Sequence, residues 1–169
     1  MNLVRSMPWM KKMPNPQLDS VIFRSAARTD LEAIIDLLAD DDLGAVREEV
    51  SRPLHCAYIN AYEALTEDQN QHLVVVELAG DVVGCLQLSF IPGLSRLGMW
   101  RGQIESVRIA REFRSSGLGR KMFVWAIDEC RARDCGLVQL TSDKTRGDAL
   151  RFYQSLGFEN SHEGFKLSL

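Results

Sequence analysis

A turn rich in serine and glycine joins a strand-like apolar run to a helix-like apolar run. Its sequence is Arg114-Ser115-Ser116-Gly117-Leu118-Gly119. The first amides of a helix lack acceptors within the helix, and the helix dipole adds partial positive charge there. Glycine lets a ligand approach the backbone closely. Because phosphate is the anion that such helix starts commonly bind, the turn predicts a phosphate-binding site.

Three phosphate-binding patterns are compared with this turn. A Walker loop requires Gly-Lys followed by Ser or Thr, whereas Gly119 precedes Arg120-Lys121-Met122, so this pattern is excluded. A dinucleotide fingerprint requires a third small residue, which Met122 replaces, and the turn follows a late strand. The third pattern, RxxGxG, is present. Two other interpretations stay open: a nucleotide-binding protein that uses the same glycine turn, and a glycine turn at a helix start that binds no ligand.

The RxxGxG pattern and a second segment resemble the coenzyme A signature of the GNAT superfamily of acetyltransferases. The pattern follows Glu-Ser-Val-Arg-Ile-Ala (105–110), and about thirty residues later comes a segment of the form A-x-x-x-Y-x-x-x-G-F, from Ala149 through Tyr153 to Phe158. The resemblance covers residues 21–169.

The resemblance implies a single α/β domain with a mixed, mostly antiparallel sheet and helices on both faces. It also implies acetyl-coenzyme A as co-substrate and no metal. Backbone groups of Val107 and Ile109 would pair with the pantetheine arm. The pyrophosphate would be held by amides of the turn, namely Arg114, Ser115, Ser116, Gly117, Leu118, Gly119 and Arg120. Family members often have asparagine three residues before the alanine of the second segment, and Arg146 stands there in this chain; its role is left open.

Two residues are the candidates for proton transfer to and from an amine acceptor. An alkyl ammonium with a pKa of about 10.4 costs roughly 4 to 5 kcal/mol to deprotonate at pH 7, so a base is needed. Glu105 is the candidate base, on the strand before the turn, and alternation predicts that it shares a face with Val107 and Ile109 unless a bulge intervenes. Tyr153 matches the position of the family's general acid.

The acceptor is expected to bind between the first two helices and the connection before residue 104, but the cues there disagree. Acidic side chains that could attract a cation are Asp40, Asp41, Asp42, Glu48 and Glu49. An apolar wall could come from Tyr58, Tyr62, Phe90, Met99 and Trp100, and a carboxylate could meet Arg96 or Arg101. A small-molecule amine is favoured over a peptide. A non-catalytic acyl-coenzyme A sensor is the alternative from another class.

Hydrophobic periodicity predicts the elements that position these residues. Strands are expected at 21–24, 73–78, 82–90, 104–110, 137–141 and 165–169, and helices at 31–38, 54–65, 118–130 and 149–156. Thr29 and Glu32 have capping-box spacing at the start of the first helix. Residues 91–101 are expected to form a long connection.

Length and composition fit one domain, with residues 1–20 as a flexible arm before an acetyltransferase domain at 21–169. The chain has 169 residues and a net charge of -3, which gives no global attraction to nucleic acid or an anionic membrane. The four cysteines form no CxxC motif and the three histidines lack ligand spacing. A cytoplasmic protein with reduced cysteines is therefore expected, and a homodimer is plausible by analogy only.

Overall fold

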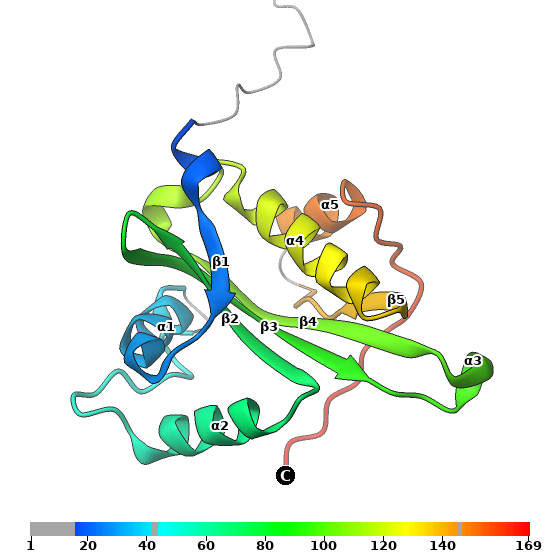
Figure 1. The fold of residues 1–169 in the computed structure, drawn as a ribbon, viewed down its shortest axis with the longest axis horizontal. Helices are drawn as coiled ribbons and strands as arrows, with labels where there is room; N and C mark the ends of the chain where they lie inside the picture. Colours follow the sequence, from blue (N-terminus) through cyan, green and yellow to red (C-terminus); the bar gives the residue numbers. More distant parts are fainter. Residues whose placement is uncertain (1–15, 42–43, 145–146) are drawn as a thin grey trace, which may run out of the picture.

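The computed structural model describes residues 16–41, 44–144 and 147–169 and contains one five-stranded sheet. Its strands lie side by side in chain order, β1 to β5 (Figure 1). The first four pair antiparallel, and β5 runs parallel to β4. The predicted mixed, mostly antiparallel sheet is confirmed. The strands are β1 (Ile22–Ser25), β2 (Gln71–Leu78), β3 (Asp81–Ile91), β4 (Trp100–Ile109) and β5 (Cys135–Leu140).

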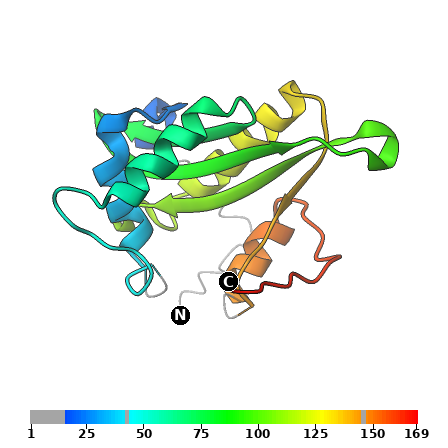
Figure 2. The same ribbon diagram turned by 90° about the horizontal axis from the view of Figure 1, so that it is seen from below.

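Helices cover the sheet on both faces, as predicted. In Figure 1, α1 and α2 lie on one side of the diagonal sheet, while α4 and α5 lie on the other. A short helix, α3, sits at the end of the hairpin formed by β3 and β4, which projects from the body in both ribbon views (Figures 1 and 2). The helices are α1 (Leu31–Ala39), α2 (Cys56–Glu67), α3 (Ser95–Gly98), α4 (Leu118–Ala132) and α5 (Gly147–Gln154), with 3-10 turns η1 (Pro16–Ser20), η2 (Arg28–Asp30) and η3 (Arg111–Phe113).

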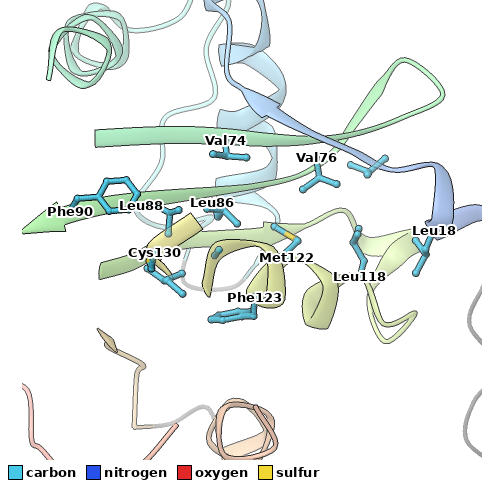
Figure 3. Packing of buried hydrophobic residues seen from close by; sticks show 13 residues of the cluster. Leu18, Val74, Val76, Leu86, Leu88, Phe90, Leu118, Met122, Phe123 and Cys130 are labelled. Carbon is cyan, nitrogen blue, oxygen red and sulfur yellow. The ribbon is translucent and has the colours of Figure 1, made fainter. Parts of the chain in front are cut away.

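Alternation along the strands divides the core into two clusters. On one face, strand residues such as Val74, Leu86 and Leu88 pack against Met122 and Phe123 of α4 (Figure 3). On the other face, Val75 and Cys85 pack against α1, whose contributions include Ile34 and Leu37. Because successive side chains of a strand point to opposite faces, the two clusters assign a face to each strand residue near the site.

The start of α1 differs from the predicted capping box. The carboxylate of Asp30, not the Thr29–Glu32 pair, accepts a hydrogen bond from the Ala27 amide at 2.7 Å. Asp30 is buried and also binds Arg24 at 2.6 and 3.0 Å. This bidentate contact lowers the pKa of Asp30 because it stabilises the carboxylate.

The connection before β4 is shorter than predicted. β3 continues to Ile91 and β4 begins at Trp100, so only residues 92–99 lie between them. The glycines and the proline of this segment are confined to the hairpin end. Leu94 and Leu97 there are fully exposed.

The two chain ends also differ from expectation. The predicted last strand at 165–169 is wrong, since these residues have no strand pairing, and Phe165, Leu167 and Leu169 are exposed. With no burial of these side chains, nothing offsets the entropy of ordering a strand. Of the expected arm, residues 1–15 lie outside the described residues. Leu18, in η1, is buried in the core cluster.

None of the helices in the described ranges is both long and apolar enough to cross a lipid bilayer.

Candidate active site

The turn before α4 adopts a backbone that exposes amides to a ligand. Ser115 has a φ of +60° and Gly117 has a φ of +103°, so the chain changes direction twice before α4 begins at Leu118. Apart from its chain neighbours, no heavy atom of the described ranges lies within 4 Å of where a Cβ on Gly117 would stand. Helix geometry leaves the first-turn amides of α4, including those of Gly119 and Arg120, without acceptors inside the helix. The open space beside Gly117 and these amides suit an anion.

Three other amides of the turn already donate hydrogen bonds within it. The Arg114 amide contacts the Arg111 carbonyl and the Ser116 amide contacts the Phe113 carbonyl, both at 3.3 Å. The Leu118 amide contacts the Ser116 hydroxyl, also at 3.3 Å. All three contacts are long for amide hydrogen bonds, so they hold the turn weakly.

Gly119 has a second role in packing. A Cβ at this position would lie 3.2 Å from Cδ1 of Ile109 and 3.6 Å from Cζ of Phe152. The glycine therefore brings α4 close to both β4 and α5. The sequence explained Gly119 by ligand approach alone.

Side chains of the turn are held by groups outside it. The Arg114 guanidinium contacts the Asp40 carboxylate at 2.7 Å, the Asp40 carbonyl at 2.8 Å and the Ile109 carbonyl at 3.1 Å. Arg111 contacts the same carboxylate at 2.8 Å. Asp40 was expected to attract a cationic acceptor, and the structure instead places it between two arginines. Its contacts fix the end of α1 against the turn.

Two basic residues at the start of α4 also form side-chain contacts with groups outside the turn. The Arg120 guanidinium donates to the hydroxyl of Ser155, beyond α5, at 2.7 Å. The Lys121 ammonium contacts the Leu18 carbonyl at 2.8 Å and the Asp19 carboxylate at 2.7 Å. Any contribution of Arg120 to an anion site in this conformation therefore comes from its amide.

β4 is paired with β5 over only the first half of the length of β4. The two strands pair from Trp100 with Cys135 to Ile104 with Leu140, where β5 ends. The next residues of β4, from Glu105 to Ile109, have β3 alongside on one edge. The other edge, which faces the start of α4, is not paired with a strand in the described part of the chain. Val107 and Ile109, the residues expected to pair with an extended ligand, lie in this stretch.

A β-bulge places Glu105 on the opposite face from the one predicted. Cys85 pairs with Arg108 and Gln87 pairs with Glu105. The paired residues are two positions apart on β3 but three positions apart on β4, so β4 has one extra residue here. Ser106, inside this irregular stretch, has a φ of +52°. Glu105 therefore does not share a face with Val107 and Ile109. The bulge, which was named as the exception to that prediction, adds a residue that reverses the alternation.

The burial pattern on each side of the bulge gives the same result. Ile104, Val107 and Ile109 belong to the cluster under α4. Glu105 alternates with Ile104 and lies opposite Gln87, which puts it on the face of α1 and α2. The Glu105 side chain is exposed there.

Tyr153 lies on α5 within a group of aromatic rings. Its ring centroid is 5.5 Å from that of Phe123, 5.6 Å from Phe152 and 6.3 Å from Phe158. The Tyr153 carbonyl accepts hydrogen bonds from Leu156 and Phe158 at 3.0 and 3.1 Å. These contacts fix α5 beside α4, on the opposite sheet face from Glu105. Tyr153 and Glu105 therefore lie on opposite faces of the sheet.

A cavity of about 110 Å³ lies between α1, α2 and the sheet face that carries Glu105. Its walls are mostly apolar, and Gln87 and Ser106 bring polar groups to it. The hydroxyls of its two tyrosines are already occupied, since Tyr58 donates to Glu48 and Tyr62 donates to the Ala26 carbonyl. The lining residues are Leu31, Ile34, Ile35, Leu38, Tyr58, Ala61, Tyr62, Leu65, Leu73, Cys85, Gln87 and Ser106.

The expected acceptor wall is divided by the structure. Tyr58 and Tyr62 line the cavity, whereas Phe90 is buried on the α4 face beneath the Arg133 guanidinium. Asp42 and Arg146 lie outside the described residues. Gln87 and Gln103 were not predicted as site residues, although polar residues alternate with apolar ones along β3 and β4, as at the exposed face of a strand.

No group of three or more His, Cys, Asp or Glu side chains with the geometry for a metal ion occurs within the described ranges.

Comparison with known proteins gives the family. Residues 31–158 match the model of the acetyltransferase (GNAT) family. Aminoalkylphosphonate N-acetyltransferase of Salmonella typhimurium is 29% identical over 113 residues, which are 67% of this chain and 73% of that protein. Glucosamine 6-phosphate N-acetyltransferase of Trypanosoma brucei brucei is 31% identical over 90 residues, 53% of this chain and 59% of that protein.

A solved structure extends the match to most of the chain. The crystal structure of a transcriptional regulator from Bacillus halodurans C-125 superposes with a TM-score of 0.86 at 44% identity, covering 88% of this chain and 99% of that one. The residues that the family model matches, 31–158, contain the turn, β4 and α5. The chain therefore belongs to the acetyltransferase (GNAT) family.

Proposed function

We propose that the protein transfers an acetyl group from acetyl-coenzyme A to the amine of a small molecule. The observation that carries this proposal is the junction of an open, glycine-containing helix start with the edge of β4 beside which no strand of the described residues lies. An anionic diphosphate suits the first feature and an extended, amide-bearing arm suits the second.

The residues at this junction fit coenzyme A. Amides between Arg114 and Arg120 would hold the diphosphate, with those of Gly119 and Arg120 the most available because they start the helix. Backbone groups of Val107 and Ile109 would pair with the pantetheine arm. When bound, the co-substrate supplies an acetyl thioester. The family match supports this choice of donor.

Glu105 is the proposed base. Its carboxylate would accept a proton from the acceptor ammonium, directly or through one water molecule, so that the neutral amine can attack. At pH 7 the neutral form of an amine of ordinary pKa lies roughly 4 to 5 kcal/mol above its ammonium form, and this is the cost that the step must meet. Glu105 is exposed and lies opposite Gln87, which lines the cavity, and this position supports access to an acceptor.

Tyr153 is the proposed acid. Its phenolic proton would go to the sulfur of the departing thiol, whose ordinary pKa is about 8.5. Aromatic neighbours on three sides restrict the ring, which favours a fixed position for the hydroxyl.

The choice of a small-molecule acceptor is supported by the two relatives. Both are named for acceptors that combine an amine with a phosphorus oxyanion. The mostly apolar cavity beside Glu105 is small, at about 110 Å³. A compact amine suits such a space better than a folded protein surface.

The test measures binding and turnover separately. Calorimetry with acetyl-coenzyme A should show binding, and release of free thiol should depend on an added amine from a panel that includes peptides. Thiol release with small amines and little with peptides is the expected result. Absence of binding would contradict the coenzyme A site, and faster reaction with peptides would contradict the acceptor class.

A non-catalytic acyl-coenzyme A sensor is the second candidate. The observation that favours it is the name of the Bacillus halodurans structure, a transcriptional regulator. A sensor would bind acetyl-coenzyme A as tightly as an enzyme but would release no thiol with any amine. The same two measurements therefore separate the two candidates.

A further inference from the structure

The face of the sheet that carries Glu105 also carries a row of polar side chains across four strands. Gln71 lies opposite Ser89, Ser89 opposite Gln103, and Gln103 opposite Gln139. Gln87 lies one row closer to the bulge, opposite Glu105. We call Gln71, Gln87, Ser89, Gln103 and Gln139 the polar shelf.

Two observations place Gln103 and its neighbours on β4 on this face. A Cβ on Gly102 would collide with Sγ of Cys130 in α4, and Ile104 is buried in the cluster under α4. Alternation then puts Arg101, Gln103 and Glu105 together on the opposite face. β4 thus presents a cation, an amide and a carboxylate in sequence toward the same side.

Within the described residues, the polar shelf has hydrogen-bonding groups that no other protein group uses. Gln71 Oε1 accepts from Ser89 at 2.7 Å and from Gln87 at 3.1 Å, while Gln103 Oε1 accepts from Gln139 at 2.8 Å. Each glutamine amide has two donor hydrogens and one oxygen with two acceptor positions. The internal bonds orient the side chains and leave several donors and acceptors for a polar ligand.

Arg101 stands at the end of this row without a partner among the residues that the structure describes. Other arginines of the sheet differ, since Arg24 contacts Asp30 and Glu77, and Arg108 lies 3.7 Å from Asp41. Arg101 is half-buried between Ile91 and Leu137 on the neighbouring strands. A guanidinium in such a place presents a fork of donors that matches an oxyanion.

We propose that Arg101 binds a phosphate or phosphonate group of the acceptor, with Gln103 and the rest of the polar shelf contacting the part between that group and the amine. This inference rests on the proposed transferase function and on Glu105 as the base. Arg101 and Glu105 lie four residues apart, roughly 13 Å between Cα atoms at the usual rise. Arginine and glutamate have long side chains, which can close that span when they extend toward each other, so that one small acceptor can contact both.

The test compares matched amines with and without the oxyanion. The pairs are glucosamine 6-phosphate with glucosamine, and 2-aminoethylphosphonate with ethylamine. The wild type should acetylate the phosphorus-bearing member of at least one pair with a kcat/KM at least about 10-fold higher than its partner. Arg101→Gln should lower that kcat/KM by about 10- to 100-fold, mainly through KM, and leave the uncharged analogue within about twofold.

Arg131→Gln is the matched control, because the Arg131 side chain is exposed on α4, which covers the opposite face of the sheet from Arg101; it should leave the acetylation of both members of each pair unchanged. Equal acetylation of both members by the wild type, or an equal loss for both in Arg101→Gln, would overturn the assignment.

A binding measurement separates this inference from the transferase proposal. Calorimetry of glucosamine 6-phosphate and 2-aminoethylphosphonate, in the presence of coenzyme A without the acetyl group, should show binding to the wild type and weaker binding to Arg101→Gln. If no amine releases thiol but this difference persists, the transferase proposal fails and the anion site stands. If the variant binds both ligands as the wild type does, the anion site fails whatever the turnover.

Discussion

Replacing Gly117 with aspartate and with asparagine isolates the charge at the helix start. Both side chains are nearly the same size, and a Cβ at this position would meet open space. Both variants must adopt the φ of +103° that glycine adopts here, at a cost of about 1 to 2 kcal/mol. The two variants therefore differ chiefly by one negative charge beside the proposed diphosphate.

The size of the charge effect follows from Coulomb's law. Two unit charges about 5 Å apart repel by about 3 kcal/mol at an effective dielectric of about 20. Gly117 is exposed, so solvent and salt reduce this value. We therefore expect Gly117→Asp to bind coenzyme A at least about 10-fold more weakly than Gly117→Asn at low salt, with a smaller difference at 0.5 M salt.

Calorimetry with coenzyme A at the two salt concentrations measures the difference, and thermal unfolding gives the control. The two variants should lose similar stability, about 2 to 8 °C in Tm, because they share the backbone cost. Equal affinities of the two variants at low salt would refute an anion beside Gly117, and with it the coenzyme A site.

Three further predictions concern proton transfer and stability. Glu105→Gln should slow acetyl transfer most at low pH, where the acceptor is most protonated, and a pH–rate profile equal to that of the wild type would remove Glu105 as base. Tyr153→Phe should lower kcat about 10- to 100-fold with little change in coenzyme A affinity; unchanged kcat would contradict the acid role. Asp30→Asn should destabilise the fold by about 1 to 3 kcal/mol at pH 7. Because Arg24 lowers the pKa of Asp30 in the folded state, this stabilisation is complete above the unfolded pKa of about 3.9 and is lost as pH falls through the folded value. Urea denaturation at pH 7 and pH 3 should therefore show a smaller difference between the two proteins at pH 3.

Local patterns predicted the elements whose side chains repeat over several turns or steps. The apolar spacing of Leu118, Met122 and Ala126 predicted α4, and all three side chains are buried. The strands around Ala79-Gly80 were predicted from two β-rich runs and a turn. The segment 165–169 alternates apolar and polar residues and forms no strand, because such a pattern stabilises a strand only when a partner edge and a buried face are present.

The candidate site likewise has features that the sequence predicts and features that it does not. The turn at 114–119 was recognisable because an anion site at a helix start depends on adjacent residues. The contacts of Asp40 with Arg111 and Arg114 could not be recognised from the sequence, since Asp40 lies more than seventy positions before both arginines. The face of the sheet on which Glu105 lies could not be recognised either, because a single extra residue at the bulge reverses it.

By itself, the sequence determined the fold class, the family resemblance and the helix start that would hold a diphosphate, because these depend on residue type and short-range spacing. Only the tertiary structure decided which face of the sheet Glu105 occupies and which side chains restrain the turn. It also placed Arg101 and the glutamines of the polar shelf on the same face as Glu105. Strand register and bulges bring those residues together, and register depends on contacts between strands that no local pattern contains.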